Sequence, residues 1–100
     1  MIVQRNTYEA KSGRVGDLVA FVKGLDERAR SAGFRSYRVF TSRWGGAGNR
    51  VIVEFDWESQ AEMEKVWERW NATAGADGTF GEQWWQVCDH LSDSELLDPE

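Results

Sequence analysis

The residues of this chain that could do chemistry are mostly aromatic, and six of its one hundred residues are tryptophan. Tryptophan combines a large apolar surface with an indole N–H that needs a hydrogen-bond partner when it is buried. A chain of this length does not need six tryptophans to fill its core. We therefore expect some of them to line a small-molecule pocket or a subunit interface.

Residues suited to nucleophilic, acid–base or metal chemistry are few. His90 is the only histidine and Cys88 the only cysteine, which excludes an internal disulfide and leaves no ligand spacing for a metal. We interpret His90 as a residue near a helix C-terminus that interacts with the helix dipole, with catalysis as the alternative. Cys88 falls on an apolar stripe and is predicted to pack as a small hydrophobe. We expect no metal and no cofactor.

Length and composition predict a single globular domain over residues 1–100. No apolar run approaches the roughly 18 residues of a membrane helix. The chain opens directly into strand-like alternation, so we expect no targeting peptide. A lone cysteine favours a reducing compartment, and we expect a cytoplasmic protein without membrane contact.

The charges are divided unevenly between the two halves of the chain. Residues 1–50 carry ten basic and four acidic side chains, a net of +6, and residues 51–100 carry two and thirteen, a net of −11. A basic half can indicate nucleic-acid binding, but its arginines are dispersed along strand-like segments. The pI near 4.9 also opposes phosphate binding. We expect no nucleic-acid partner, and we expect the halves to complement each other within the fold or across a dimer.

Hydrophobic periodicity predicts the order β-α-β-β-α-(α)-β. The predicted strands are 2–11, 34–44, 50–57 and about 95–98, and the predicted helices are 15–32, a segment from Ser59 to Trp70 and a segment from Thr79 to Leu91. Gly33 is placed to end the first helix in a left-handed conformation. The glycines at 45–48 form a hairpin turn rather than a phosphate loop, because no Lys-Ser/Thr pair or helix follows them.

Both later helices begin with a capping-box pattern, in which a Ser or Thr and a Glu three residues later satisfy the first backbone donors. Ser59 and Glu62 form the first pattern, and Thr79 and Glu82 form the second. Residues 71–78 read as a loop of small residues. One face of the first of these helices carries Met63, Val66, Trp67 and Trp70, and one face of the other carries Phe80, Trp84, Val87, Cys88 and Leu91. Trp85 lies off that stripe and is a candidate for an interface or a pocket lid.

This order predicts an α+β, ferredoxin-like domain, an antiparallel four-stranded sheet with helices on one face. Bulky residues alternate onto both faces of its strands. The strand over 50–57 is predicted to hold Val51, Val53, Phe55 and Trp57 on one side and Ile52, Glu54 and Asp56 on the other. The strand over 34–44 is predicted to hold Tyr37 and Val39 on one side and Phe34, Phe40 and Trp44 on the other. Since helices cover one face only, we expect a homodimer in which two sheets face each other.

Three segments resemble NIPSNAP-like proteins. They are the opening IVQRNTYEAKSG, the block RVIVEFDWESQAEMEKVWERW, and the aromatic last helix followed by Ser94-Glu95-Leu96-Leu97. The resemblance covers nearly the whole chain and implies the dimeric α+β barrel superfamily. That superfamily also holds cofactor-independent antibiotic-biosynthesis monooxygenases, haem-degrading monooxygenases and muconolactone-type isomerases. NIPSNAP-like proteins have no well-defined common reaction.

The resemblance also implies where a ligand would bind, because the superfamily's pocket lies between the sheet and its helices. The ligand-binding candidates are Asn6, Tyr8, Trp67, Trp70, Phe80 and Trp84, and the candidates for a catalytic role are Asn6, Trp67 and His90. The haem-degrading members have an Asn and a Trp placed like Asn6 and Trp67. Their haem-ligand His follows that Trp on the same helix, whereas His90 falls on a later one, and this opposes haem ligation.

Three functions remain open at this point. The aromatic residues can be a plain core stripe, and the chain is then a structural dimerisation module. They can form an aromatic box that binds a hydrophobic, flat small molecule, which is the interpretation we adopt. They can also belong to a cofactor-independent monooxygenase, in which Asn6 and a tryptophan stabilise a substrate anion and its oxygen adduct.

Overall fold

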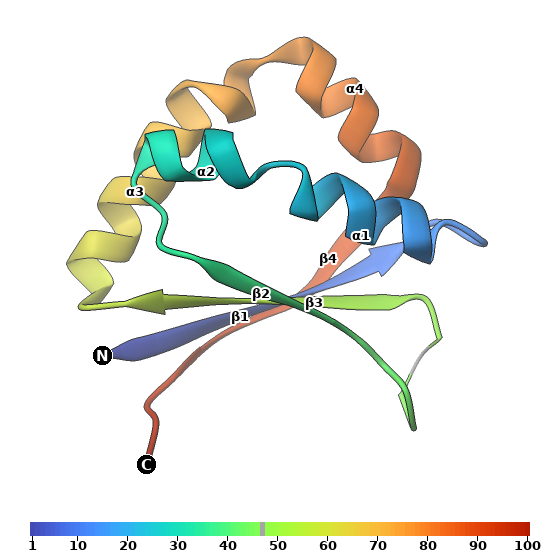
Figure 1. Cartoon of the computed structure of the whole chain (residues 1–100), viewed down its shortest axis with the longest axis horizontal. Helices are drawn as coiled ribbons and strands as arrows, with labels where there is room; N and C mark the ends of the chain where they lie inside the picture. Colours follow the sequence, from blue (N-terminus) through green and yellow to red (C-terminus); the bar gives the residue numbers. More distant parts are fainter. Residues whose placement is uncertain (47) are drawn as a thin grey trace.

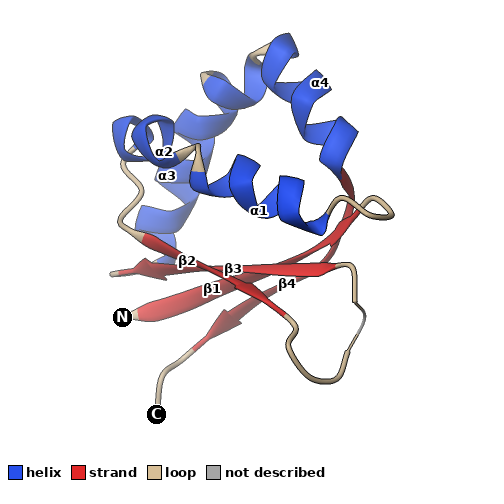
Figure 2. Ribbon diagram, turned by 45° about the vertical axis from the view of Figure 1, so that its right-hand side comes forward, coloured by secondary structure: helices blue, strands red, loops and turns tan. Residues whose placement is uncertain are grey.

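A computed structural model describes residues 1–46 and 48–100 of the chain. In it an antiparallel four-stranded sheet, ordered β2-β3-β1-β4, carries the helices on one face (Figures 1 and 2). This is the α+β ferredoxin-like fold expected from the sequence. Its elements are β1 (Ile2–Ala10), α1 (Val15–Lys23), α2 (Asp26–Ala32), β2 (Tyr37–Thr41), β3 (Arg50–Trp57), α3 (Gln60–Ala72), the 3₁₀ turn η1 (Ala74–Ala76), α4 (Gly78–Val87) and β4 (Cys88–Leu97).

The two central strands give the sheet an inner face against the helices. On β3 every second residue from Val51 to Trp57 is buried, and the residues between them are not. Antiparallel pairing places Asn6 of β1 opposite Val53, so the even-numbered residues of β1 share this inner face. The sheet thus presents an apolar row beside a row that includes the buried amides of Gln4 and Asn6.

The segment predicted as one helix over 15–32 is two helices, α1 and α2. Gly24 ends α1, and the carbonyl of Val22 accepts hydrogen bonds from the Leu25 amide and from the Tyr37 hydroxyl. Glycine is a poor helix former, and a carbonyl held by a side chain on the neighbouring strand is drawn out of the helical ladder. At the end of α2, Gly33 has a φ of 106°, so its predicted role as a left-handed helix stop is confirmed.

The N-cap of α3 is confirmed in its first half. The Ser59 side chain accepts a hydrogen bond from the backbone amide of Glu62, and the Glu62 carboxylate accepts from the amide of Glu58 rather than of Ser59. The cap predicted for the last helix is wrong by two residues. Asp77 caps α4 by accepting from the Thr79 amide, and it also pairs with Arg28 at 2.8 Å.

The predicted last helix is too long and the predicted last strand too short. Helix α4 ends at Val87, and the ten-residue strand β4 follows it directly and pairs with β1. His90 therefore lies on β4, opposite Glu9 on the outer face of the sheet, and not at a helix C-terminus. Its imidazole is exposed and lies 3.0 Å from the Asp89 carboxylate. The helix-dipole interpretation of His90 is therefore wrong.

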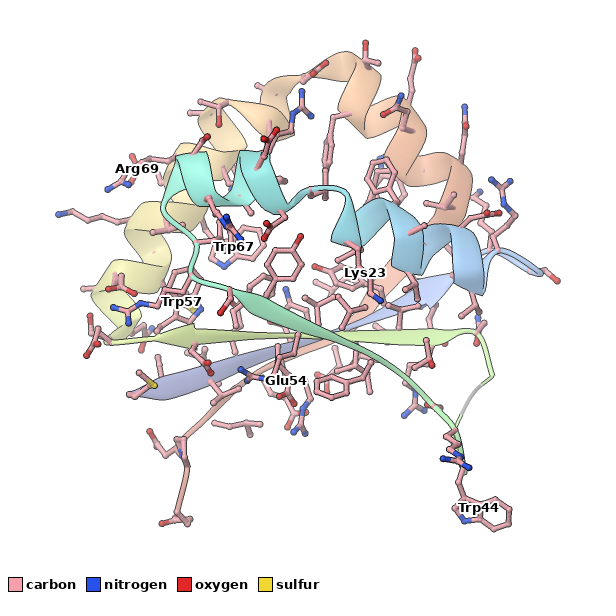
Figure 3. All side chains as sticks on the ribbon, in the orientation of Figure 1. Lys23, Trp44, Glu54, Trp57, Trp67 and Arg69 are labelled. Carbon is pink, nitrogen blue, oxygen red and sulfur yellow. The ribbon has the colours of Figure 1, made fainter. Side chains whose placement is uncertain are left out.

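The second strand is also shorter than the predicted range of 34–44. Phe34 precedes β2 and is buried on the inner side of the sheet, where it contacts Trp57 and Trp67, so its predicted position on the side of the strand opposite Tyr37 is wrong. Trp44 follows β2, is 96% exposed and projects away from the body of the protein (Figure 3). Trp57 is fully buried on β3, as an architectural tryptophan should be.

Arginines of the first half of the chain pair with carboxylates of the second half, which confirms that the two charges complement each other within the fold. On the outer face of the sheet, Arg5 and Arg38 both contact Glu54, and Arg38 also contacts Asp56. The guanidinium of Arg38 holds the pKa of the Asp56 carboxyl below its usual value. Figure 3 shows Glu54 on the side of the sheet away from Trp57 and Trp67.

Candidate functional site

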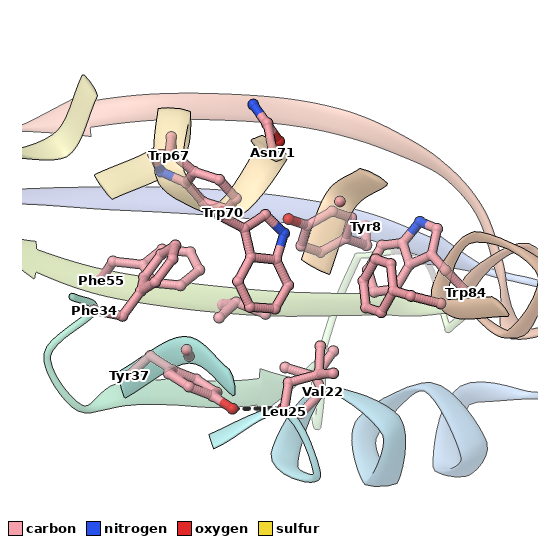
Figure 4. Close-up of a pocket in the computed structure, with 14 residues that line it drawn as sticks. Tyr8, Val22, Leu25, Phe34, Tyr37, Phe55, Trp67, Trp70, Asn71 and Trp84 are labelled. Atoms are coloured by element: carbon pink, nitrogen blue, oxygen red, sulfur yellow. Dashed lines mark hydrogen bonds between the residues drawn. The ribbon is translucent and has the colours of Figure 1, made fainter. Parts of the chain in front are cut away.

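A cavity of about 280 Å³ lies between the inner face of the sheet and the helices (Figure 4). We call it the aromatic cavity. It is lined by Tyr8, Val22, Leu25, Ala29, Phe34, Tyr37, Val53, Phe55, Trp67, Trp70, Asn71, Gly75, Phe80 and Trp84. Ligand pockets are typically about 300–1,000 Å³, so this cavity lies at the lower limit of that range and suits only a small molecule, such as one of two or three fused rings.

Two groups of aromatic rings form opposite ends of the cavity. At one end Phe34 lies between Phe55, Trp67 and Trp70, with ring centroids 4.9–5.7 Å apart. At the other end, Trp84 meets Tyr8 edge-on at 5.1 Å and stacks on Phe80 at 6.3 Å. Trp70 links the two ends through an edge contact with Phe80. Edge and offset contacts of this kind stabilise rings in fixed orientations.

Hydrogen bonds at their edges hold several of these rings against the walls. The Trp67 indole donates to Gln4 Oε1 at 2.8 Å, and the Trp57 indole donates to the same oxygen at 3.1 Å. The Tyr37 hydroxyl donates to the Val22 carbonyl at 2.6 Å. A ring anchored in this way cannot move into the cavity without leaving a buried polar group unpaired. The cavity is therefore maintained by the fold.

The polar interior continues from Gln4 along β1. Gln4 Nε2 donates to Asn6 Oδ1 at 3.4 Å, and Asn6 Nδ2 donates to the Tyr8 hydroxyl at 3.1 Å. Ser94 of β4 donates to Asn6 Oδ1 at 2.6 Å. The three β1 residues are at i, i+2 and i+4, so the strand pleat places them in one row on the inner face. Of the three, only Tyr8 lines the aromatic cavity.

Burial raises the pKa of Tyr8 to about 12, and it raises the pKa of Tyr37 as well. The unfolded chain releases the Tyr8 proton near its ordinary pKa of 10 while the folded protein still holds it. We therefore expect the free energy of unfolding to be unaffected by Tyr8 below pH 10 and to fall by about 2–3 kcal/mol between pH 10 and pH 12. Urea unfolding across this range measures the loss.

The matched variant for this pH effect is Tyr8→Phe, because losses from other groups are common to both proteins. Burial also raises the pKa of the Cys88 thiol to about 11, for example, and that contribution cancels in the difference. The stability advantage of the wild type over Tyr8→Phe should shrink as the pH rises from 10 to 12. A constant difference would show that Tyr8 ionises at its ordinary pKa.

The structure brings most of the sequence-predicted binding residues together. Tyr8, Trp67, Trp70, Phe80 and Trp84 all line the aromatic cavity. Asn6 does not line it: the side chain is 4% exposed, and its amide contacts Gln4, Tyr8 and Ser94.

Three further residues singled out from the sequence lie away from the cavity wall. His90 is on the outer face of the sheet, and Trp85 is 56% exposed and does not line the cavity, which leaves no lid role for it there. Cys88 is fully buried beside the core, as predicted for a small hydrophobe.

The sequence interpretation missed part of the site. Phe34, Tyr37 and Phe55 line the aromatic cavity, and Gln4 anchors its tryptophan wall. The alternation of β1 was a signal for Gln4, since a strand that puts Asn6 and Tyr8 inward also puts Gln4 inward. The signal for Phe34 was Gly33, because an apolar residue that follows a left-handed glycine stop commonly packs back against the helix, although Phe34 itself lies outside any strand or helix.

Within residues 1–46 and 48–100, no group of three or more His, Cys, Asp or Glu side chains is arranged to hold a metal ion. None of the helices that the structure describes is both long enough and apolar enough to cross a bilayer.

Comparison with protein-family models and with curated protein sequences gives no match. Solved structures do match. A NIPSNAP domain protein from Burkholderia xenovorans, itself uncharacterised, superimposes with a TM-score of 0.78 at 19% identity, over 100% of this chain and 95% of that one. A NIPSNAP family protein from Agrobacterium tumefaciens gives 0.70 at 19% identity, over 99% and 92%.

A third match, a candidate antibiotic biosynthesis monooxygenase from Bordetella bronchiseptica, gives a TM-score of 0.75 at 16% identity over 99% of this chain and 96% of that one. At these identities the likeness is one of fold. The resemblance noted in the sequence is confirmed at that level. The chain has the α+β ferredoxin-like fold of NIPSNAP domain proteins, which it shares with candidate antibiotic biosynthesis monooxygenases.

Proposed function

We propose that this protein binds a flat, hydrophobic aromatic molecule in the aromatic cavity. The observation that carries the proposal is a cavity of about 280 Å³ whose walls are almost entirely apolar and aromatic. Small-molecule sites are usually concave and lined mainly by hydrophobic and aromatic side chains, with a few polar groups. Here hydrogen bonds to Gln4 and to the Val22 carbonyl hold Trp67 and Tyr37 at the walls, which supports a pocket over a plain core stripe.

Titration with fluorene, a flat three-ring hydrocarbon, tests this function. Tryptophan emission should change saturably, because Trp67, Trp70 and Trp84 line the cavity. Ala29→Phe places a ring in the cavity and should weaken binding by about tenfold or more, equivalent to about 1.4 kcal/mol. The matched control is Ala20→Phe on the exposed side of α1. Unchanged emission in the wild type would favour the structural dimerisation module.

Cofactor-independent oxygenation is a second candidate function. It is favoured by the similarity in fold to candidate antibiotic biosynthesis monooxygenases. The simplest mechanism for this function would have Asn6 contact the substrate. The Asn6 amide, however, does not line the cavity and already forms hydrogen bonds with Tyr8 and Ser94. Oxygen uptake with anthrone, one O₂ consumed per anthrone converted to anthraquinone and water, tests this function. Uptake that is lost in Asn6→Ala would favour it over binding alone.

We also propose that the protein works as a homodimer in a reducing compartment, for which the cytoplasm is the simplest case. The helix-free face of the sheet exposes Phe40, and most of edge strand β4 is exposed. On this helix-free face Arg5 and Arg38 pair with the carboxylates of Glu54 and Asp56. Because these charges balance, two copies of the face would not repel each other electrostatically. Sedimentation should give a dimer that Phe40→Glu dissociates. A wild-type monomer at micromolar concentration would contradict this proposal.

A further inference from the structure

The buried polar row along β1 has only one consistent set of hydrogen-bond directions. An indole nitrogen can donate and cannot accept. Since Trp57 and Trp67 both point their indole N–H groups at one end of the Gln4 amide, that end is the oxygen. The Gln4 nitrogen therefore faces Asn6, and the Asn6 atom that receives it is the oxygen.

A second contact fixes the Asn6 amide in the same orientation. Ser94 Oγ lies 2.6 Å from the atom assigned as Asn6 Oδ1. That separation is usual for an O–H···O bond, at about 2.5–3.0 Å, and shorter than the roughly 2.7 Å lower limit of N–H···O bonds. The Asn6 nitrogen therefore points at Tyr8 and donates to the phenol oxygen at 3.1 Å.

The Tyr8 hydroxyl oxygen thus accepts a hydrogen bond from Asn6, and the hydroxyl proton remains available for donation to another group. Within the described residues the structure gives that proton no acceptor. The other tyrosine of the cavity differs, because Tyr37 uses its proton on the Val22 carbonyl. Trp70 adds a second such donor, since its indole nitrogen has no partner within the same residues. Figure 4 shows the Tyr8 hydroxyl and the Trp70 nitrogen on the facing sides of their rings.

The lining of the cavity restricts the charge of a group that can receive these protons. No lysine or arginine lines it. A buried carboxylate or phosphate without a cationic partner is strongly disfavoured. The acceptor that suits the site is therefore a neutral oxygen on an otherwise apolar ring system.

We infer that Tyr8 determines the specificity of the aromatic cavity by donating its hydroxyl proton to a carbonyl oxygen of the bound molecule, which makes the ligand class aromatic ketones or quinones. This inference rests on the function proposed above. Asn6 acts as a positioning residue, because its amide turns the Tyr8 proton away from the strand and toward the ligand. The hydroxyl proton is present throughout the neutral pH range, because the ordinary pKa of tyrosine is near 10 and burial raises that of Tyr8 further.

Two ligands that differ by one oxygen test the inference. 9-Fluorenone and fluorene have the same three-ring frame, and only fluorenone carries a carbonyl. Equilibrium dialysis should show that Tyr8→Phe lowers fluorenone affinity by about two- to tenfold, the effect of one net hydrogen bond, and leaves fluorene affinity unchanged. Tyr37→Phe is the matched control, because the Tyr37 hydroxyl is already occupied, and it should not distinguish the two ligands.

The possible results separate this inference from the proposed function. If fluorene and fluorenone both bind and Tyr8→Phe weakens both equally or neither, the role of Tyr8 is overturned while the pocket stands. If neither ligand binds the wild type, the proposed function fails and the inference fails with it.

An infrared spectrum of fluorenone bound to the wild type keeps the test independent of the folding of Tyr8→Phe. A hydrogen bond to the carbonyl lowers its stretching frequency, so we expect a band below the position found in hexane. A band at the hexane position would contradict donation by Tyr8.

Discussion

Gln4→Leu is expected to lower the free energy of unfolding by about 2–5 kcal/mol, although it replaces a polar residue with an apolar one of similar size. The Gln4 side chain is 8% exposed, and its oxygen accepts from both Trp57 and Trp67. Leucine removes that acceptor and leaves two indole donors unpaired, each at a cost of about 1–3 kcal/mol. Urea unfolding followed by circular dichroism measures the change.

Two control measurements separate this mechanism from a general effect of the substitution. Gln60→Leu makes the same chemical change on the exposed side of α3 and should alter stability by less than about 0.5 kcal/mol. In a Trp67→Phe background one of the two donors is already gone, so Gln4→Leu should cost about 1–3 kcal/mol less than it does in the wild type. Additive losses would contradict a shared acceptor.

The row to which Gln4 belongs also shows how far sequence reasoning extends into the site. The resemblance to NIPSNAP-like proteins predicted that Asn6 and Tyr8 of β1 face the helices, and helical spacing predicted the shared face of Trp67 and Trp70. Both predictions concern one element at a time. Tyr8 lines the cavity, whereas Asn6 does not. This difference depends on contacts with other elements, such as the hydrogen bond from Ser94 of β4 to Asn6. No periodicity in β1 contains that information.

The misjudged last helix has a definite physical cause. The register of β4 against β1 shifts twice, leaving Asp89 and Ser92 without direct partners as bulges. The inner residues of β4 are consequently Cys88, Leu91, Ser94 and Leu96. Cys88 and Leu91 are three positions apart, which matches the period of a helix and not the two-residue period of a strand. The apolar stripe of α4 was therefore predicted to continue through Leu91. Pairing with β1 overrides that local pattern.

Phe34 was misplaced for a related reason, since the alternation of β2 was extended back over residues that do not belong to the strand. Its direction is set instead by the end of α2. With Gly33 in the left-handed conformation, the Phe34 amide donates to the Ala29 carbonyl, which is the hydrogen-bond pattern of a Schellman motif. That turn directs the Phe34 ring into the protein, between the sheet and α3.

Phe34→Ala is expected to lower the free energy of unfolding by about 3–5 kcal/mol, the usual range for removing a buried phenyl ring. The ring contacts Phe55, Trp57, Trp67 and Trp70, so its loss removes the common neighbour of one whole end of the cavity. Trp44→Ala truncates a larger ring that is 96% exposed and should change stability by less than about 0.5 kcal/mol. Urea unfolding of both variants measures the contrast.

Because Phe34 is a wall of the aromatic cavity as well as a core residue, the same variant has a second expected property. Removing the ring adds its volume to the existing cavity, and an apolar cavity of about 150 Å³ is already large enough to bind benzene. A ligand that binds only the folded state stabilises it by RT ln(1 + [L]/Kd). Benzene should therefore restore part of the stability lost in Phe34→Ala. With benzene present, Trp44→Ala should be no more stable than the wild type. If benzene gives Phe34→Ala no more stabilisation than it gives the wild type, the site has collapsed on truncation, and the walls of the cavity are less rigid than their hydrogen bonds to Gln4 and Val22 imply.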